Sequence, residues 1–165
     1  EKLKNAITKL SMQSEQQLKY LLNKKKKKKL TPFLNLGTLG LNYGLQGMQF
    51  TATSTVAESQ TLSMPNYIHS IPNNNDNQDI VSMGTNGSLL TRKAIDNAFE
   101  ILAIHTIAVM QAIDVIECSK KLSPKGLNIY KSFRKVCTKT IDDKPLSNTI
   151  GNAIIFLKES NLSDI

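Results

Sequence analysis

One stretch of this 165-residue chain constrains its fold more than any other, because 14 of the 19 residues from Ala98 to Ile116 are apolar. They fall on nearly every face of a helix, and a helix that is hydrophobic all round is buried in a large assembly or spans a membrane. The polar residues that interrupt it and are costly in hydrocarbon are Glu100, His105, Gln111 and Asp114. No apolar run reaches the length that spans a bilayer. We therefore expect a helix over about residues 80–118, buried in a multi-subunit helical bundle, and no membrane contact.

The rest of the chain has the pattern of an all-α fold. Apolar residues recur near one face at helical spacing over about residues 2–26, at Leu3, Ile7, Leu10, Leu18, Leu21 and Leu22. A second helix, over about residues 44–62, carries short side chains that permit close packing and ends before Met64-Pro65. Two shorter helices are expected after Ser123-Pro124 and after Asp143-Lys144-Pro145. Residues 1–165 are interpreted as a single long-helix bundle segment.

Charge and cysteine usage exclude several classes of site. The net charge is +8, but six of the 21 basic residues form one run from Lys24 to Lys29. The other 15 basic residues nearly balance the 13 acidic ones, so there is no distributed basic face and no nucleic-acid partner is expected. Cys118 and Cys137 have no CxxC spacing and no matching histidine pair, so no metal site is expected. Free thiols indicate a cytoplasmic protein.

The most specific segment is SIPNNNDNQDIVSMG, at residues 70–84. Four asparagines, a glutamine and two aspartates crowd into residues 73–79, directly after Pro72 and directly before the long apolar helix. Asn and Asp favour turns, because their side chains bond to nearby backbone and tolerate left-handed conformations. Physical chemistry alone predicts an ordered polar loop that caps the following helix.

The word order N-Q-D-x-V-S-M-G before a long buried helix resembles the aromatic amino acid ammonia-lyases, which are the histidine, phenylalanine and tyrosine lyases and the related aminomutases. Ser14-Glu15-Gln16-Gln17 resembles the S-E-R-R segment of that family, with both arginines replaced. The segment from Leu30 to Leu34 resembles its L-P-x-F/L turn, and Asn42-Tyr43-Gly44-Leu45 resembles the segment that opens the next helix. Spacing and order agree from about Lys2 to about Ser119. The chain is similar to the C-terminal part of such an enzyme.

The resemblance implies a reaction and a quaternary structure. Family members eliminate ammonia from an aromatic amino acid to give an α,β-unsaturated acid, using a methylidene-imidazolone electrophile and a tyrosine base. The electrophile forms from an internal Ala-Ser-Gly, which does not occur in this chain, and the tyrosine lies on an N-terminal loop without a counterpart here. The resemblance therefore implies a fragment with no catalytic residue of its own, inactive alone. The prosthetic group would form in the missing N-terminal part of a homotetramer.

The same resemblance assigns candidate substrate-binding residues. Gln78 matches a pocket position that carries Glu in histidine lyases and Gln in the phenylalanine and tyrosine enzymes, so the tyrosine or phenylalanine type is favoured. Asn74 matches a second pocket position, Asn77 belongs to the same motif, and Gln46 matches a more variable one. A histidine ammonia-lyase, an aromatic amino acid 2,3-aminomutase and a non-catalytic helical oligomerisation module remain alternatives.

Four other ionisable positions are interpreted as structural. His105 projects from an apolar stretch and is expected to be a core histidine, and His69 matches no functional position of the motif. Asp114 and Glu117, three residues apart on a helix, are expected to face solvent or a partner and not to form an acid–base pair.

Overall fold

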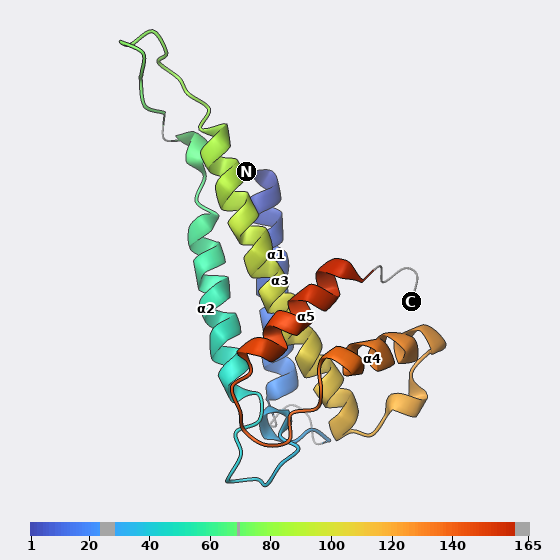
Figure 1. The fold of residues 1–165 in the computed structure, drawn as a ribbon. Helices are drawn as coiled ribbons and strands as arrows, with labels where there is room; N and C mark the ends of the chain where they lie inside the picture. Colours follow the sequence, from blue (N-terminus) through green and yellow to red (C-terminus); the bar gives the residue numbers. More distant parts are fainter. Residues whose placement is uncertain (24–28, 69, 161–165) are drawn as a thin grey trace.

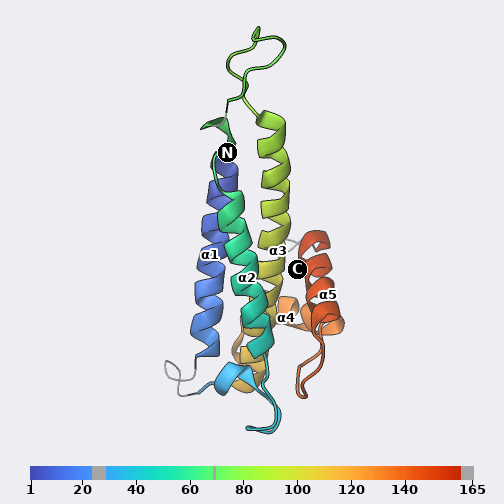
Figure 2. The ribbon, with the colours of Figure 1, turned by 90° about the vertical axis from the view of Figure 1, so that its left-hand side faces the viewer.

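The structure is a computed structural model that describes residues 1–23, 29–68 and 70–160. Its long helices, which lie side by side in an elongated bundle, are α1 (Lys2–Leu22), α2 (Gln46–Leu62) and α3 (Gly84–Val115) (Figures 1 and 2). The shorter ones are α4 (Pro124–Val136) and α5 (Ser147–Glu159), with the 3-10 turns η2 (Pro32–Leu34), η3 (Asn66–Ile68) and η4 (Ser119–Lys121). The described residues contain no β-strand, and the all-α prediction is confirmed.

Helix boundaries follow local backbone conformation. Helix α3 begins at Gly84 and not near residue 80, because Met83 adopts a left-handed conformation with φ 50°. Helix α1 ends at Leu22, because the backbone of Asn23 is extended. The predicted helix continued to about residue 26, but residues 24–28 lie outside the described ranges. The prediction for α4 is confirmed, since Ser123 caps it by accepting from the Gly126 N–H at 3.1 Å, with proline at the first turn.

The inward face of α1 is largely polar, which the apolar pattern did not predict. Its buried residues are Lys4, Thr8, Ser11, Ser14, Glu15, Leu18 and Leu22. Leu3 and Leu10 were expected on the same face as Leu18, but they are 59% and 62% exposed. The buried polar groups are satisfied: Lys4 Nζ donates to Met64 O at 2.8 Å and pairs with Glu1 at 2.9 Å. Apolar side chains of α1 are therefore left on the outside of this bundle.

Helix α3 is the centre of the core, as its composition predicts. Ile101, Ala103, Ile104 and Ala108 are fully buried, and α1, α2 and α5 all pack against it. The expectation that no segment is long enough to span a membrane is wrong by length and composition, because α3 has 32 residues and is apolar enough to cross one. Half of its most apolar stretch is buried inside the structure.

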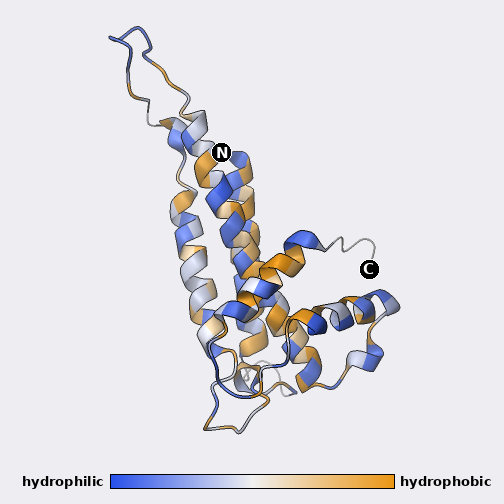
Figure 3. Ribbon diagram, viewed as in Figure 1, coloured by the Kyte–Doolittle hydropathy of each residue, from blue (hydrophilic) through white to orange (hydrophobic). Residues whose placement is uncertain are grey.

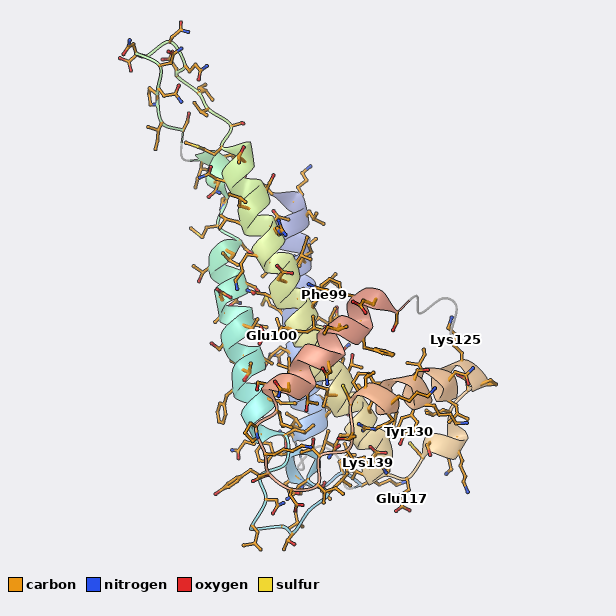
Figure 4. The ribbon with its side chains drawn as sticks, viewed as in Figure 1. Phe99, Glu100, Glu117, Lys125, Tyr130 and Lys139 are labelled. Atoms are coloured by element: carbon orange, nitrogen blue, oxygen red, sulfur yellow. The ribbon has the colours of Figure 1, made fainter. Side chains whose placement is uncertain are left out.

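The polar residues that interrupt α3 serve as attachment points for later segments. Gln111 is buried, and its Nε2 donates to Thr140 O at 2.6 Å and to Leu34 O at 3.3 Å. Asp114 accepts hydrogen bonds from Tyr130 and Arg134 of α4 and lies 3.2 Å from Lys139 Nζ. Tyr130 and Lys139 are labelled in Figure 4. Asp114 and Glu117 were expected to face solvent or a partner: Asp114 is buried and ion-paired within its own chain, and Glu117 is exposed.

Candidate functional site

The polar motif forms a self-contained loop that projects beyond the end of the bundle (Figures 1 and 2). Its centre is closed by two backbone hydrogen bonds between Asn73 and Gln78, at 3.1 and 3.3 Å. Asn74, Asn75 and Asp76 all adopt left-handed conformations, with φ of 54°, 54° and 60°. Asn and Asp tolerate this region better than other residues with a Cβ, which explains the run of these residue types.

The loop presents its side-chain amides outward. Residues 71–80 are all exposed, and the tip is the hydrophilic end of the molecule (Figure 3). Within the described residues, the side chains of Asn74, Asn77 and Gln78 have no hydrogen-bond partner, although the backbone of all three is ordered by the loop. The donors and acceptor of each amide are therefore open to water or to another molecule.

The prediction that this loop caps the long helix is wrong. The N-cap position of α3 is occupied by Met83, which makes no side-chain cap hydrogen bond, and the first turn of α3 has no acidic residue. The side chain that stabilises the base of the loop is Ser70, whose Oγ accepts from the Val81 N–H at 2.9 Å and donates to Asp79 O at 3.2 Å. The Asn-rich tip has no capping role in this fold.

Gln46 lies at the other end of the bundle from the loop. It is the first residue of α2, whose 17 residues span about 25 Å at 1.5 Å per residue. The loop follows the last turn of α2, so the structure groups Asn74, Asn77 and Gln78 but does not bring Gln46 to them (Figure 1). Gln46 and Gln78 of one chain cannot contact the same small molecule.

The turn before Gln46 has a partner that sequence analysis did not single out. Asp143, from the segment between α4 and α5, accepts hydrogen bonds from the Tyr43 and Gly44 N–H groups. These residues are about 100 positions apart, and no local pattern relates them. In the sequence, a carboxylate two residues before a proline, as in Asp143-Lys144-Pro145, indicates only a turn.

The remaining ionisable candidates do not build a site. His105 is half-buried and not fully within the core, and burial lowers the pKa of its imidazole below the ordinary 6.5. His69 lies outside the described residues. No group of three or more metal-ligating side chains occurs in the part of the chain that the structure describes, and both cysteines there are free thiols. Burial raises the pKa of the Cys137 thiol, which makes it a poor nucleophile.

Comparison with known proteins identifies the family of this chain. The sequence model of the aromatic amino acid lyases matches residues 1–135. The chain belongs to this family. It is 38% identical over 151 residues to a tyrosine ammonia-lyase of Cereibacter sphaeroides, a match covering 90% of the chain and 28% of that enzyme.

The chain is also similar in sequence to an aminomutase and similar in fold to a solved structure. A MIO-dependent tyrosine 2,3-aminomutase of Streptomyces globisporus is 37% identical over 131 residues, covering 79% of the chain and 24% of the enzyme. The crystal structure of a tyrosine aminomutase from Streptomyces globisporus superposes with a TM-score of 0.92 at 32% identity, covering 98% of this chain and 30% of that one. The chain spans about three tenths of the length of the relatives it matches.

One of these relatives is MIO-dependent, and the resemblance implies that the methylidene-imidazolone group forms from an Ala-Ser-Gly sequence. The 165-residue sequence contains no Ala-Ser-Gly. The exposed side-chain amides of the loop can hydrogen-bond a polar molecule, but they cannot act as an electrophile.

Proposed function

We propose that this chain is the C-terminal helical part of a cytoplasmic aromatic amino acid ammonia-lyase of the tyrosine or phenylalanine type. The whole enzyme eliminates ammonia from its substrate to give an α,β-unsaturated acid, and the methylidene-imidazolone, formed in another part of the enzyme, supplies the electrophile. This chain contributes polar substrate contacts and part of the core of a homotetramer. Taken alone it is inactive, because it has neither the electrophile nor the tyrosine base.

The observation that carries this proposal is the loop at residues 70–83. A loop whose side chains stabilised only the fold would use its amides for caps or tertiary hydrogen bonds, yet those of Asn74, Asn77 and Gln78 have no partner among the described residues. Three left-handed residues in succession are instead maintained at the tip. Strained backbone that holds outward-facing polar groups is typical of ligand-binding loops.

Gln78 favours tyrosine or phenylalanine over histidine as substrate. Its neutral amide offers two donors and an acceptor, whereas the glutamate of histidine lyases offers a carboxylate that suits an imidazole and an ammonium group. This argument supports the tyrosine or phenylalanine type without separating the two substrates.

The test replaces Gln78 in the full-length enzyme. Deleting a polar partner from a desolvated pocket costs roughly 1–3 kcal/mol, which at 1.36 kcal/mol per tenfold is about a 5- to 150-fold fall in kcat/KM for Gln78→Ala. Gln78→Glu should shift preference towards histidine. The melting temperature should not change in either variant, because the side chain is exposed and makes no hydrogen bond in the described fold. Gln60→Ala, at an exposed position of α2, is the matched control.

Unchanged kinetics for Gln78→Ala would contradict the proposed contact. The aminomutase alternative is favoured by the similarity to the Streptomyces enzyme and is tested by the same assay. An aminomutase releases a β-amino acid together with, or in place of, the unsaturated acid. An oligomerisation module without catalysis would show no Ala-Ser-Gly upstream in its reading frame and no product from the full-length protein.

A further inference from the structure

The turn that leads into α2 is held by a carboxylate from the far end of the chain. Asp143 Oδ2 accepts from the Tyr43 N–H at 2.9 Å, and its Oδ1 accepts from Tyr43 at 3.1 Å and from Gly44 at 3.2 Å. Tyr43 and Gly44 stand directly before the first residues of α2. A carboxylate that accepts several backbone N–H groups makes stronger hydrogen bonds than a neutral acceptor does.

This carboxylate supplies what α2 lacks in its own sequence. The N-cap position of α2 is Leu45, which has no side-chain oxygen, and the first turn of the helix has no acidic residue. Negative charge near a helix N-terminus is favourable because the unpaired N–H groups there carry partial positive charge. Asp143 therefore places a negative charge near the start of α2. In other helices such a charge can come from an acidic residue in the first turn.

The segment that carries Asp143 is itself fixed to the core. Gln111 of α3 is 1% exposed, and its amide both donates to Thr140 O at 2.6 Å and accepts from the Thr140 N–H at 3.3 Å. One residue further on, Ile141 O accepts from Asn42 Nδ2 at 3.1 Å. The backbone after α4 is thus anchored on one side to α3 and on the other to the turn before α2.

The turn has little freedom to adopt another shape. Gly44 has φ +60°, and a Cβ there would lie 2.8 Å from Phe33 O, so a side chain is excluded. Buried Asn35 donates from Nδ2 to Asn42 O at 2.7 Å on the inner side. Gln46 follows two residues after Gly44, is half-buried and is the first residue of α2, so this turn leads directly into it.

We propose that Asp143 is a positioning residue for substrate binding, which acts by fixing the turn that presents Gln46. The inference rests on the proposed function and on the candidate role of Gln46 in substrate binding, at a different pocket from the one that Gln78 of the same chain would reach. It assigns a role in substrate affinity to the region after α4, which lies beyond the residues matched by the family's sequence model. Asp143 is exposed, so water competes for its hydrogen bonds and the expected effect is moderate.

The test compares adjacent aspartates in the full-length enzyme. Asp143→Ala should raise KM for tyrosine and phenylalanine about tenfold with a smaller change in kcat, because the misdirected Gln46 loses contacts made with substrate and transition state alike. Asp142→Ala removes the same charge one residue away, where Oδ1 has only a 3.4 Å contact with Asn42, and should leave KM unchanged. Asp143→Asn keeps one carbonyl oxygen and should recover part of the loss.

A double-mutant cycle with Gln46→Ala separates positioning from general stability. If Asp143 acts through Gln46, Asp143→Ala causes no further rise in KM in the Gln46→Ala background. An equal rise in both backgrounds, or an equal effect of Asp142→Ala, overturns the proposal. An unchanged KM for Gln46→Ala alone also overturns it, whereas the wider function is decided independently by Gln78 at the other end of the bundle.

Discussion

At the scale of single residues, the loop tip makes a paired comparison possible. Asn74 and Asn75 are neighbours of the same type with the same φ of 54°, and only Asn74 matches a substrate position of the family. Glycine accepts this conformation without strain, so replacement by glycine removes the amide while the backbone stays permitted. We expect Asn74→Gly to lower kcat/KM of the full-length enzyme about 5- to 30-fold, as for a lost polar contact, and Asn75→Gly to lower it little. Equal effects of the two variants would mean that the loop's shape, and not the Asn74 side chain, matters.

A second prediction at this scale concerns His105. Burial lowers the pKa of its imidazole below 6.5 in the folded chain. Below the ordinary pKa the unfolded state binds a proton that the folded state resists, so the free energy of unfolding should fall as the pH drops below about 6.5. His105→Gln should flatten this part of the pH dependence. Urea denaturation between pH 8 and pH 5 measures the difference, and an identical slope in the variant would exclude His105 as its source.

At the scale of elements, Asp114 decides how α4 docks on α3. Its side chain is 1% exposed and pairs with Arg134, which is 12% exposed, and with Tyr130. Removing one partner of a buried ion pair leaves the other charge uncompensated, so Asp114→Asn should lower the free energy of unfolding by about 3–5 kcal/mol. Asp96 pairs with Lys158 at 2.9 Å on the surface, and Asp96→Asn should have little effect. Chemical denaturation of the two variants measures the difference. Similar losses of unfolding free energy would show that burial does not make the Asp114 ion pair more stabilising than the surface pair.

At the scale of the whole molecule, an apolar groove remains exposed on the surface of the chain. Between α1 and α3 lies a groove of about 290 Å³, lined by Ile7, Leu10, Ser11, Ser14, Ile95, Ala98, Phe99 and Leu102. Contiguous apolar surface of this kind marks interaction sites, and the proposed homotetramer would bury it. We expect the 165-residue chain to self-associate at micromolar concentration.

Two exposed leucines test whether this groove drives the association. Leu10 is 62% exposed in the groove and Leu41 is 75% exposed in the loop before α2. Leu10→Glu should weaken self-association in sedimentation experiments, because a charge in an apolar contact is costly to desolvate, while Leu41→Glu should not change it. A compact monomer of the unaltered chain at micromolar concentration would contradict the oligomer proposal.

The sequence by itself determined the helical class, the buried α3 and the family. Apolar periodicity and residue-type preferences are local properties, so they predict helices and the Asn-rich turn without knowledge of the fold. The order of residues in the loop is also a local property, and its resemblance to the family motif indicated Gln78, Asn74 and Asn77 as candidates.

Only the tertiary structure decided which faces meet. Leu3 and Leu10 turned outward although their spacing matched that of Leu18, because α1 satisfies its buried polar stripe through contacts with residues such as Met64 and Ser59. The separation of Gln46 from Gln78 and the hydrogen bonds of Asp143 to Tyr43 and Gly44 likewise depend on chain segments about 30 and 100 residues apart. Such relations arise from packing in three dimensions, which no local sequence pattern records.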